Sequence, residues 1–202
     1  MSTHIRVSEI LAQFRNLDMI PRDVLNTKGE IGTEVHGNIH AHNLGQFPLY
    51  DMYPHYDRHG VIKNWSKRGE GYFDSYLMYD RKENPRYANM EKRFYCDDLM
   101  LTGQVDAIRY YDDKLPVITD FKCSASVDEE IWSMQAHYYK YLTTQAGIET
   151  ADYMQWIQLK VDKNGNACKP NIITFTFDEF MMSRCINEAI LIWERKKDAK
   201  IA

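Results

Sequence analysis

Two aspartates and a lysine lie on a predicted β-hairpin in the middle of the chain. Side chains alternate across a strand, so Asp120 and Lys122 share one face of the strand that carries them. If the turn of this hairpin is centred on Asp113, residues whose numbers add up to 226 lie opposite each other. Asp106 on the preceding strand then faces Asp120, and the two carboxylates are predicted to be cross-strand neighbours.

The chemistry of such a pair indicates a divalent cation. Two carboxylates about 5 Å apart repel each other unless a cation lies between them. Oxygen ligands that leave room for water suit Mg²⁺ or Mn²⁺, either of which can activate that water against a phosphodiester. Lys122 would hold the attacking water or stabilise the phosphate, with Phe121 in the core and the polar residues facing solvent. The alternative is an ordinary surface pair of Asp and Lys on an edge hairpin.

The elements that position the hairpin follow from hydrophobic periodicity and from capping residues. Thr27 and Ser126 are each followed three residues later by a glutamate, the spacing of a helix N-terminal capping box. The predicted helices are Ser8–Phe14, residue 28 to the early forties, a helix between Ser126 and Gly147, and a last helix that Asp178 opens. The predicted strands are Arg93–Cys96, Leu99–Tyr110, Pro116–Phe121, Tyr153–Val161 and Ile172–Phe177. This pattern predicts an α/β fold over residues 1–202, a single domain with a mixed central β-sheet flanked by helices.

Residues 44–87 form an aromatic and basic insertion without a clear period. Ten aromatic side chains lie in these 44 residues, interleaved with Lys and Arg. Since aromatic rings stack on unpaired bases and cations follow phosphates, the segment could form a wall beside a path for DNA. The residues expected to take part are Lys63, Lys67 and Arg68 as substrate-binding cations, and Trp65, Tyr72 and Tyr76 as surface rings. The alternative is that most of these rings pack under a long loop as a small core of their own.

Composition limits the class of protein. The net charge of −4 and a pI near 6.0 give no overall basic signal for nucleic acid, although a local basic face is still possible. The four cysteines include no pair at the spacing used by zinc ribbons and iron–sulfur clusters, so free thiols and a reducing compartment are expected. No apolar run is long enough for a membrane span. The sequence therefore predicts a cytoplasmic protein that does not bind membranes.

Several short motifs, taken in order, resemble the RecB-type branch of the PD-(D/E)XK nuclease superfamily, which includes phage, Cas4-like and mitochondrial DNA exonucleases. The motifs are Gly32-Thr33-Glu34-Val35-His36, Gly103-Gln104-Val105-Asp106, Thr119-Asp120-Phe121-Lys122, and Gln135 with Tyr139. The resemblance runs from the opening Val7-Ser8-Glu9-Ile10-Leu11 to about Leu142, and the predicted helix after Phe177 fits the closing elements of the family's fold. One departure is that Thr119 stands where the motif usually has proline.

The resemblance implies a restriction-endonuclease-like core and a set of site residues. It makes His36, Asp106 and Asp120 metal ligands, with the backbone carbonyl of Phe121 as a further oxygen ligand, and it makes Asp106, Asp120 and Lys122 catalytic. Some relatives in this branch carry four cysteines around an iron–sulfur cluster. The cysteines here lack that arrangement, so no cluster is expected beside the Mg²⁺ or Mn²⁺.

His36 and four other polar residues have simpler interpretations as well. A lone histidine beside the apolar side of a helix is more often structural than a ligand, although Gly32, one turn earlier, would allow close approach. A zinc helix with His40 is disfavoured because Gly37 follows His36 where a zinc protease needs glutamate. Gln135 and Tyr139 are DNA contacts or site organisers by resemblance, and otherwise ordinary helix polarity. Glu91 is either a carboxylate that supports the metal ligands or, as we favour, a charge at the start of a strand. Glu34 is expected to be solvated.

The function that these expectations favour is a metal-dependent DNA exonuclease acting in replication, recombination or repair. By resemblance the gene would come from a phage or mobile element, and a single-strand annealing or replication protein would be a partner besides DNA. A structure-specific endonuclease that cuts junctions or flaps would use the same site. A DNA-binding module without catalysis belongs to a different class, and the intact set Asp106, Asp120 and Lys122 argues against it.

Overall fold

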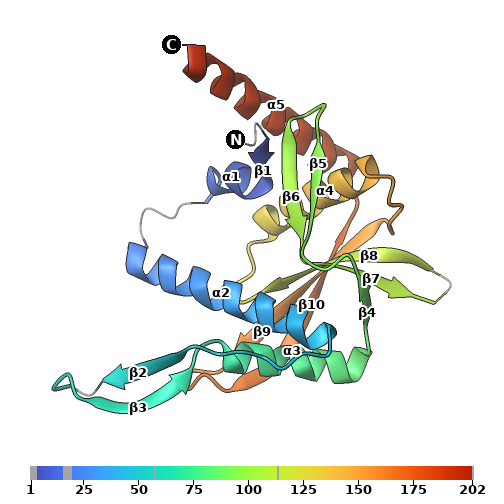
Figure 1. The fold of residues 1–202 in the computed structure, drawn as a ribbon. Coiled ribbons are helices and arrows are strands. Elements are labelled where there is room, and N and C mark those ends of the chain that lie inside the picture. Colours follow the sequence, from blue (N-terminus) through green and yellow to red (C-terminus); the bar gives the residue numbers. More distant parts are fainter. Residues whose placement is uncertain (1–3, 16–19, 57, 113, 202) are drawn as a thin grey trace.

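The computed structural model describes residues 4–15, 20–56, 58–112 and 114–201 of the 202-residue chain (Figure 1). The helices are α1 (Val7–Ala12), α2 (Arg22–Asn43), α3 (Glu70–Glu83), α4 (Glu129–Gln145) and α5 (Glu179–Ile201). The strands are β1 (Ile5–Arg6), β2 (Met52–Tyr56), β3 (Ile62–Lys67), β4 (Arg86–Ala88), β5 (Lys92–Cys96), β6 (Leu101–Val105), β7 (Ala107–Tyr111), β8 (Lys114–Lys122), β9 (Tyr153–Val161) and β10 (Ala167–Thr176). None of these helices is long and apolar enough to cross a bilayer.

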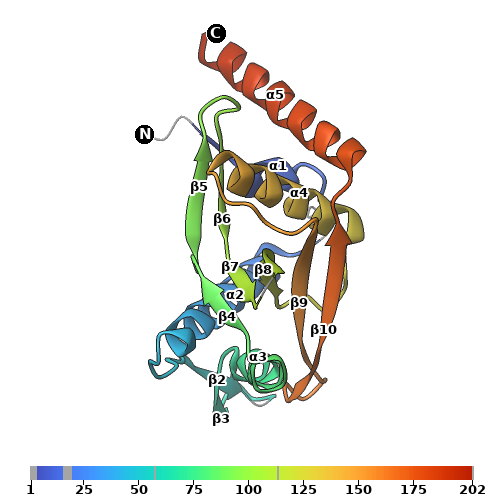
Figure 2. The same cartoon turned by 90° about the vertical axis from the view of Figure 1, so that its right-hand side faces the viewer.

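The central sheet has the strand order β10-β9-β8-β7-β4. Strands β8 and β9 run parallel and the other neighbours antiparallel, so the sheet is mixed, as the sequence predicted. Because side chains alternate along β9, Trp156 packs on one face with α1, α4 and α5, and Ile157 packs on the other with α2 and α3. Helices therefore cover both faces, which confirms the predicted α/β class (Figures 1 and 2).

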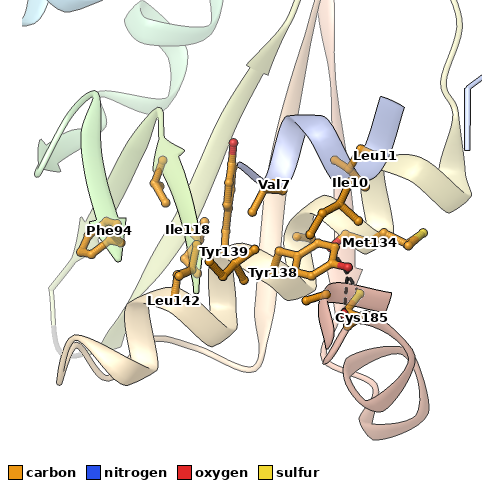
Figure 3. Packing of buried hydrophobic residues seen from close by; sticks show 14 of the residues in the cluster. Val7, Ile10, Leu11, Phe94, Ile118, Met134, Tyr138, Tyr139, Leu142 and Cys185 are labelled. Carbon is orange, nitrogen blue, oxygen red and sulfur yellow. Dashed lines mark hydrogen bonds between the residues drawn. The ribbon is translucent and has the colours of Figure 1, made fainter. Parts of the chain in front are cut away.

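The first of these two cores joins distant parts of the chain. Figure 3 shows Val7, Ile10 and Leu11 of α1 against Met134 and Tyr138 of α4. The buried Tyr138 hydroxyl donates to the carbonyl of Cys185 on α5, at 2.8 Å, which fixes that helix on α4. All four cysteines are free thiols, as expected.

A second sheet, of order β1-β6-β5, continues from the central one. The predicted strand Leu99–Tyr110 is wrong as a single strand, because the chain changes hydrogen-bonding partners at Asp106. Before this point β6 pairs with β5 and β1, and after it β7 pairs with β4 and β8. The chain changes sheets a second time between β4 and β5, and the amide of Glu91 donates to the carbonyl of Asp106 at 2.8 Å. The two crossings therefore lie side by side.

Two predicted helix starts need correction. Helix α2 begins at Arg22, directly after Pro21, so Thr27 lies inside the helix and does not cap it. Proline suits this place because it has no amide hydrogen to leave unpaired. Helix α4 is capped by Asp128, whose carboxylate accepts from the amide of Ile131 at 3.2 Å, and not by Ser126. The predicted end at Gly147 (φ +75°) is confirmed, and so is the cap at Asp178, which accepts from the amide of Met181 at 2.6 Å.

Residues 44–87 are more ordered than their sequence suggested. They form the β2–β3 hairpin, helix α3 and strand β4. Tyr76 was expected at the surface, but it is fully buried with Phe73 and Tyr79 in the core that α3 shares with α2. Tyr72 is half-buried against the same core, whereas Trp65 is 53% exposed. A large part of the aromatic content is therefore structural, and it fixes α3 and α2 on the sheet.

Candidate metal centre

Three side chains meet at the two sheet crossings. His36 comes from the middle of α2, Glu91 from the connection between β4 and β5, and Asp106 from the break between β6 and β7. The Nδ1 atom of His36 lies 3.4 Å from Asp106 Oδ2 and 3.8 Å from Glu91 Oε1. One donor atom from each of the three lies within 4.8 Å of the others. This spacing is compatible with a single ion held among them.

The backbone holds both carboxylates of this cluster in place. The amide of Phe121 donates to Asp106 Oδ2 at 2.8 Å, which ties the aspartate to the end of β8. Glu91 adopts a left-handed conformation with φ +52°, and Asn89, two residues earlier, has φ +54°. Such conformations cost about 1–3 kcal/mol each for residues other than glycine and are concentrated at functional sites. Here the strained connection brings the Glu91 carboxylate to His36.

The ring of His36 uses its two nitrogens differently. Nε2 donates to the carbonyl of Phe121 at 2.9 Å, and Nδ1 faces the carboxylates. Burial lowers the pKa of His36, but the charge and hydrogen bond of Asp106 together with the charge of Asp120 outweigh burial and raise the pKa to about 9. The resemblance made the Phe121 carbonyl a metal ligand; in this arrangement it accepts a hydrogen bond from the opposite side of the ring. Glu91 takes the position beside Nδ1.

The register of the hairpin follows the prediction away from its turn. At the turn it shifts by one residue, because Tyr111 lies opposite Lys114, and Asp113 lies outside the described residues. Ala107 lies opposite Thr119, Ile108 opposite Ile118 and Arg109 opposite Val117, and each pair of numbers adds up to 226. Asp106 stands one residue before β7, next to the end of β8 that carries Asp120. The paired residues of β7 and β8 do not include Asp106 and Asp120 themselves, so their direct cross-strand pairing stays a prediction; the charge of Asp106 acts to raise the pKa of Asp120.

The expectation that Asp120 and Lys122 face solvent was wrong for Asp120, whereas Lys122 is half-buried with its side chain 18% exposed. Asp120 is 1% exposed and forms an ion pair with Lys122 Nζ, because α4 covers this face of the sheet. Burial, followed by the charge of Asp106, raises the pKa of Asp120 to about 7. Burial also acts to raise the pKa of Asp106, but His36 and Lys122 outweigh it and hold that pKa below its usual value. The site therefore favours the ionised form of Asp106, whereas Asp120 gains or loses its proton near pH 7.

Gln135 and Tyr139 point from α4 toward this pair. The Nε2 atom of Gln135 donates to the Tyr139 hydroxyl at 2.8 Å and lies 3.4 Å from Asp120 Oδ1. Its Oε1 atom is buried and accepts no hydrogen bond from the described residues. Helix α4 can approach this closely because of Gly103 on β6: a Cβ atom there would come within 2.8 Å of Leu142 and 3.1 Å of Tyr139. The short motifs around Gly103 and Gln135 are thus in direct contact.

Two glutamates differ from their sequence-based interpretation. Glu91 was expected to be a charge at the start of a strand, but it belongs to the cluster and accepts a hydrogen bond from Gln104. Its proximity to His36 depends on a left-handed backbone and a change of sheets, and neither has a spacing signal in the sequence. Glu34 was expected to be solvated, yet it is half-buried and its Oε1 atom has no hydrogen-bond partner among the described residues.

The three cations predicted to bind DNA lie on or next to the β2–β3 hairpin. This hairpin extends away from the central sheet along the outer side of α2 (Figure 1). Lys63 is exposed, whereas Lys67 pairs with Glu70 at 3.0 Å. The guanidinium of Arg68 stacks 3.2 Å from the ring centre of Tyr53 and pairs with Glu30. The structure does not bring these cations into the cluster around His36.

Comparison with known proteins gives structural likeness only. No protein-family model and no curated protein sequence matches this chain. Among solved structures, a candidate exonuclease from Eubacterium rectale aligns at 8% identity with a TM-score of 0.49, covering 82% of this chain. The chain spans 65% of the length of that protein. The alkaline exonuclease LHK-Exo from Laribacter hongkongensis aligns over 100% of this chain and 96% of its own, at 10% identity and a TM-score of 0.43 in a complex with dAMP. At these TM-scores the likenesses carry no functional argument, so the function has to be inferred from the site.

Proposed function

We propose that this chain is a nuclease that hydrolyses phosphodiester bonds in DNA with Mg²⁺ or Mn²⁺. The observation that carries the proposal is the convergence of His36, Glu91 and Asp106 beside the buried Asp120 and its half-buried partner Lys122. Four separate parts of the chain supply these residues, and two of them do so through a change of sheet. A surface Asp and Lys pair would not require burial or a strained connection.

The donor set fits a small divalent cation. Carboxylate oxygens are the ligands that Mg²⁺ and Mn²⁺ prefer, and an imidazole nitrogen is compatible with Mn²⁺. His36, Glu91 and Asp106 would hold the ion, with Asp120 as the further ligand that the sequence resemblance implies. The resemblance also implies the Phe121 carbonyl, but that oxygen accepts from Nε2 on the opposite side of the His36 ring, so it is not placed beside an ion at Nδ1. Such an ion lowers the pKa of a bound water and neutralises charge on a phosphate. The buried Gln135 Oε1, which accepts no hydrogen bond within the described chain, is available to orient a water molecule.

The remaining polar residues have roles that follow from their positions. Lys122 lies beside Asp120 at the end of β8, where its ammonium can donate to an attacking water or to a phosphate oxygen. Tyr139 is held by Gln135 and can restrict how the strand enters. The Phe121 amide keeps Asp106 turned toward His36.

Cleavage assays with end-labelled DNA test the proposal. Cleavage is expected with Mg²⁺ or Mn²⁺ and should stop in excess chelator. Lys122→Ala should abolish it with the fold intact, while Lys114→Ala, at the exposed start of the same strand, should cut like the wild type. Cleavage that survives both chelator and Lys122→Ala would refute the assignment.

A separate measurement tests the ligands. His36→Ala and Glu91→Gln should each weaken Mn²⁺ binding by about 10–100-fold, which calorimetry can detect without DNA. If Glu91→Gln binds Mn²⁺ like the wild type, the glutamate is not a ligand.

Exonuclease action in replication, recombination or repair is the finer proposal, on the ground of the motif resemblance stated above. Covalently closed circular DNA separates it from a junction or flap endonuclease, since an exonuclease needs an end. A non-catalytic DNA-binding module would bind but never cut. A phage or mobile-element origin, a cytoplasmic location and a single-strand annealing or replication protein as partner belong to the same proposal.

Lys63, Lys67 and Arg68 stay predicted DNA contacts on the β2–β3 hairpin. Replacing all three should raise the dissociation constant for DNA and flatten its salt dependence, because each lost phosphate contact removes counterion release. Arg68 would first have to leave Glu30 and Tyr53. A salt dependence equal to that of the wild type would assign these residues to structure.

A further inference from the structure

One face of the β1-β6-β5 sheet carries exposed side chains on its two outer strands, while Thr102 on the central strand is buried between them. Residues opposite each other in the register share a face, so Arg93 of β5 lies beside Gln104, and Tyr95 lies beside Thr102. Arg6 of β1 is the partner of Thr102 on its other side. The alternate residues point the other way: Phe94 is buried in the core, and Gly103 contacts Tyr139 and Leu142 of α4. Arg6, Tyr95 and Arg93 therefore define the outward face of this sheet.

This outward face carries an exposed aromatic ring and exposed cations, the kinds of side chain that proteins use to bind single-stranded nucleic acid. Tyr95 is 54% exposed, although it lies on a strand whose neighbours Phe94 and Cys96 are buried. Arg93 is exposed, and the side chain of Arg6 is 68% exposed. An exposed aromatic ring offers a stacking surface for a base, and cations on both sides suit the phosphates.

The nearest carboxylate does not cancel these charges. Glu9 lies 3.6 Å from the guanidinium of Arg6, but it also pairs with Lys196 at 2.6 Å. Asp97 at the end of β5 pairs with His4, whose ring stands edge-on to Tyr95 at 5.4 Å between ring centres. The histidine therefore contacts the Tyr95 ring edge-on, and the tyrosine is still about half exposed to solvent.

The outward face leads directly to the metal centre. Arg93 donates to Gln104 Oε1 at 2.8 Å, and the amide nitrogen of the same Gln104 donates to Glu91. Glu91 in turn lies 3.8 Å from His36. Two hydrogen bonds thus connect an exposed guanidinium to a candidate metal ligand, so a phosphate held by Arg93 would lie beside the phosphate at the metal.

The other candidate path is electrostatically less suitable. A groove of about 1120 Å³ runs between α2 and the residues that lead into the β2–β3 hairpin, and its lining includes Glu30, Glu34 and Asp51. Two of the hairpin cations, Lys67 and Arg68, are already paired with glutamates. Phosphates would meet negative charge in this groove, whereas Arg6 and Arg93 present positive charge.

We propose, on the basis of the nuclease function above, that the outward face of the β1-β6-β5 sheet is the track on which one DNA strand reaches the metal centre. A base stacks on Tyr95 and the next phosphate toward the metal binds Arg93. Gln104 fixes the distance between this phosphate and Glu91.

Binding of a labelled single-stranded oligonucleotide, with Ca²⁺ in place of Mg²⁺ to prevent cleavage, tests the track. Tyr95→Ala should weaken binding by roughly tenfold, and Tyr95→Phe should restore it because the ring is kept. Arg93→Gln should weaken binding and reduce the slope of log K against log salt by about 0.7, the value for one phosphate on a single strand. An oligonucleotide carrying iododeoxyuridine should crosslink to the peptide that contains Tyr95.

Matched controls come from another exposed strand pair. Tyr110→Ala on β7 and Arg86→Gln on β4, which lie opposite each other and away from this face, should bind DNA like the wild type. If the wild type binds and cuts DNA but Tyr95→Ala and Arg93→Gln behave like these controls, the track is overturned and the face is left to a protein partner. If the wild type neither binds nor cuts DNA, the nuclease function itself fails. Thermal unfolding of each variant confirms that the sheet is intact.

Discussion

Replacing Asp120 with asparagine should stabilise the metal-free protein while it abolishes cleavage. Burial, together with Asp106, raises the pKa of Asp120 from 3.8 to about 7, so the folded protein favours the protonated acid. Above pH 7 the folded chain must hold this carboxylate ionised, whereas the unfolded chain ionises it freely. The asparagine has nearly the shape of the protonated acid and removes that cost.

The sign and size of the effect follow from linkage. Because the folded pKa lies above the unfolded one, the stability that protonated Asp120 contributes is complete below pH 4 and is lost as the pH rises through 7. At about 1.4 kcal/mol per pH unit, the loss reaches at most about 4 kcal/mol at pH 8. The ion pair with Lys122 disappears in the variant and reduces the gain. We therefore expect a net stabilisation of about 1–3 kcal/mol, or roughly 2–10 °C in Tm for a chain of this size.

Urea and thermal unfolding between pH 4 and pH 8.5, in chelator, measure the difference. The gain of Asp120→Asn over the wild type should be largest at pH 8 and should vanish near pH 4. Asp112→Asn, an exposed aspartate paired with Arg86 next to the turn of the same hairpin, is the control and should change little. Saturating Mn²⁺ should stabilise the wild type more than Asp120→Asn and narrow the gap. A variant that is less stable than the wild type at pH 8, or a gap independent of pH, would refute the electrostatic reasoning.

Two further predictions concern the metal and the packing of α3. The pKa of His36 is about 9 because Asp106 and Asp120 together outweigh burial, so an ion that binds Nδ1 must displace a proton. The affinity for Mn²⁺ should therefore rise from pH 7 to pH 9 by up to about tenfold per pH unit, and calorimetry in two buffers should detect the released proton. An affinity that does not change with pH would exclude His36 as a ligand. Gly71→Ala should destabilise the folded protein by about 2 kcal/mol or more, because its Cβ would lie 2.0 Å from the carbonyl oxygen of Gly165. Gly29→Ala, where a Cβ would meet no atom within 4 Å, should stabilise the protein by about 1 kcal/mol. Equal urea midpoints for the two variants would contradict the close contact between α3 and Gly165.

The part of the site on β8 could be predicted because local rules determine it. Alternation along the strand places Asp120 with Lys122 and sends Phe121 into the core, and the predicted register holds from Arg109 to Ala107, beyond an irregularity next to the turn. The mixed sheet and its flanking helices follow from the same periodicities. The burial of Asp120 could not be predicted in this way, because it depends on α4, which packs closely only through the absence of a side chain at Gly103.

Glu91 and helix α3 show where local rules stop. A left-handed residue between two sheets has no period, so Glu91 resembles any charge at the start of a strand until β5 and β6 are paired. The helical period of α3 is hard to recognise in the sequence because tyrosine combines an apolar ring with a polar hydroxyl. Tyr72 and Tyr76 can therefore be assigned either to the core or to the surface from sequence alone. Only the packing of Tyr76 against Phe121, at 5.4 Å between ring centres, shows that it belongs to the core.

The crossings between the two sheets explain why the cluster lies where it does. If β6 and β7 formed one continuous strand, the side chain of Asp106 would point to the same face as its second neighbours along the strand, and its backbone amide and carbonyl would form hydrogen bonds with an adjacent strand. At the break between β6 and β7, the carbonyl of Asp106 accepts a hydrogen bond from the amide of Glu91, and its carboxylate accepts one from the amide of Phe121. Asp106 therefore connects the segment that carries Glu91 to the end of β8 that carries Asp120. Mutual repulsion and burial work against this arrangement in the free protein, as the raised pKa of Asp120 shows. A bound cation would reverse that balance, so the same contacts that strain the metal-free chain would make it selective for a doubly charged ion.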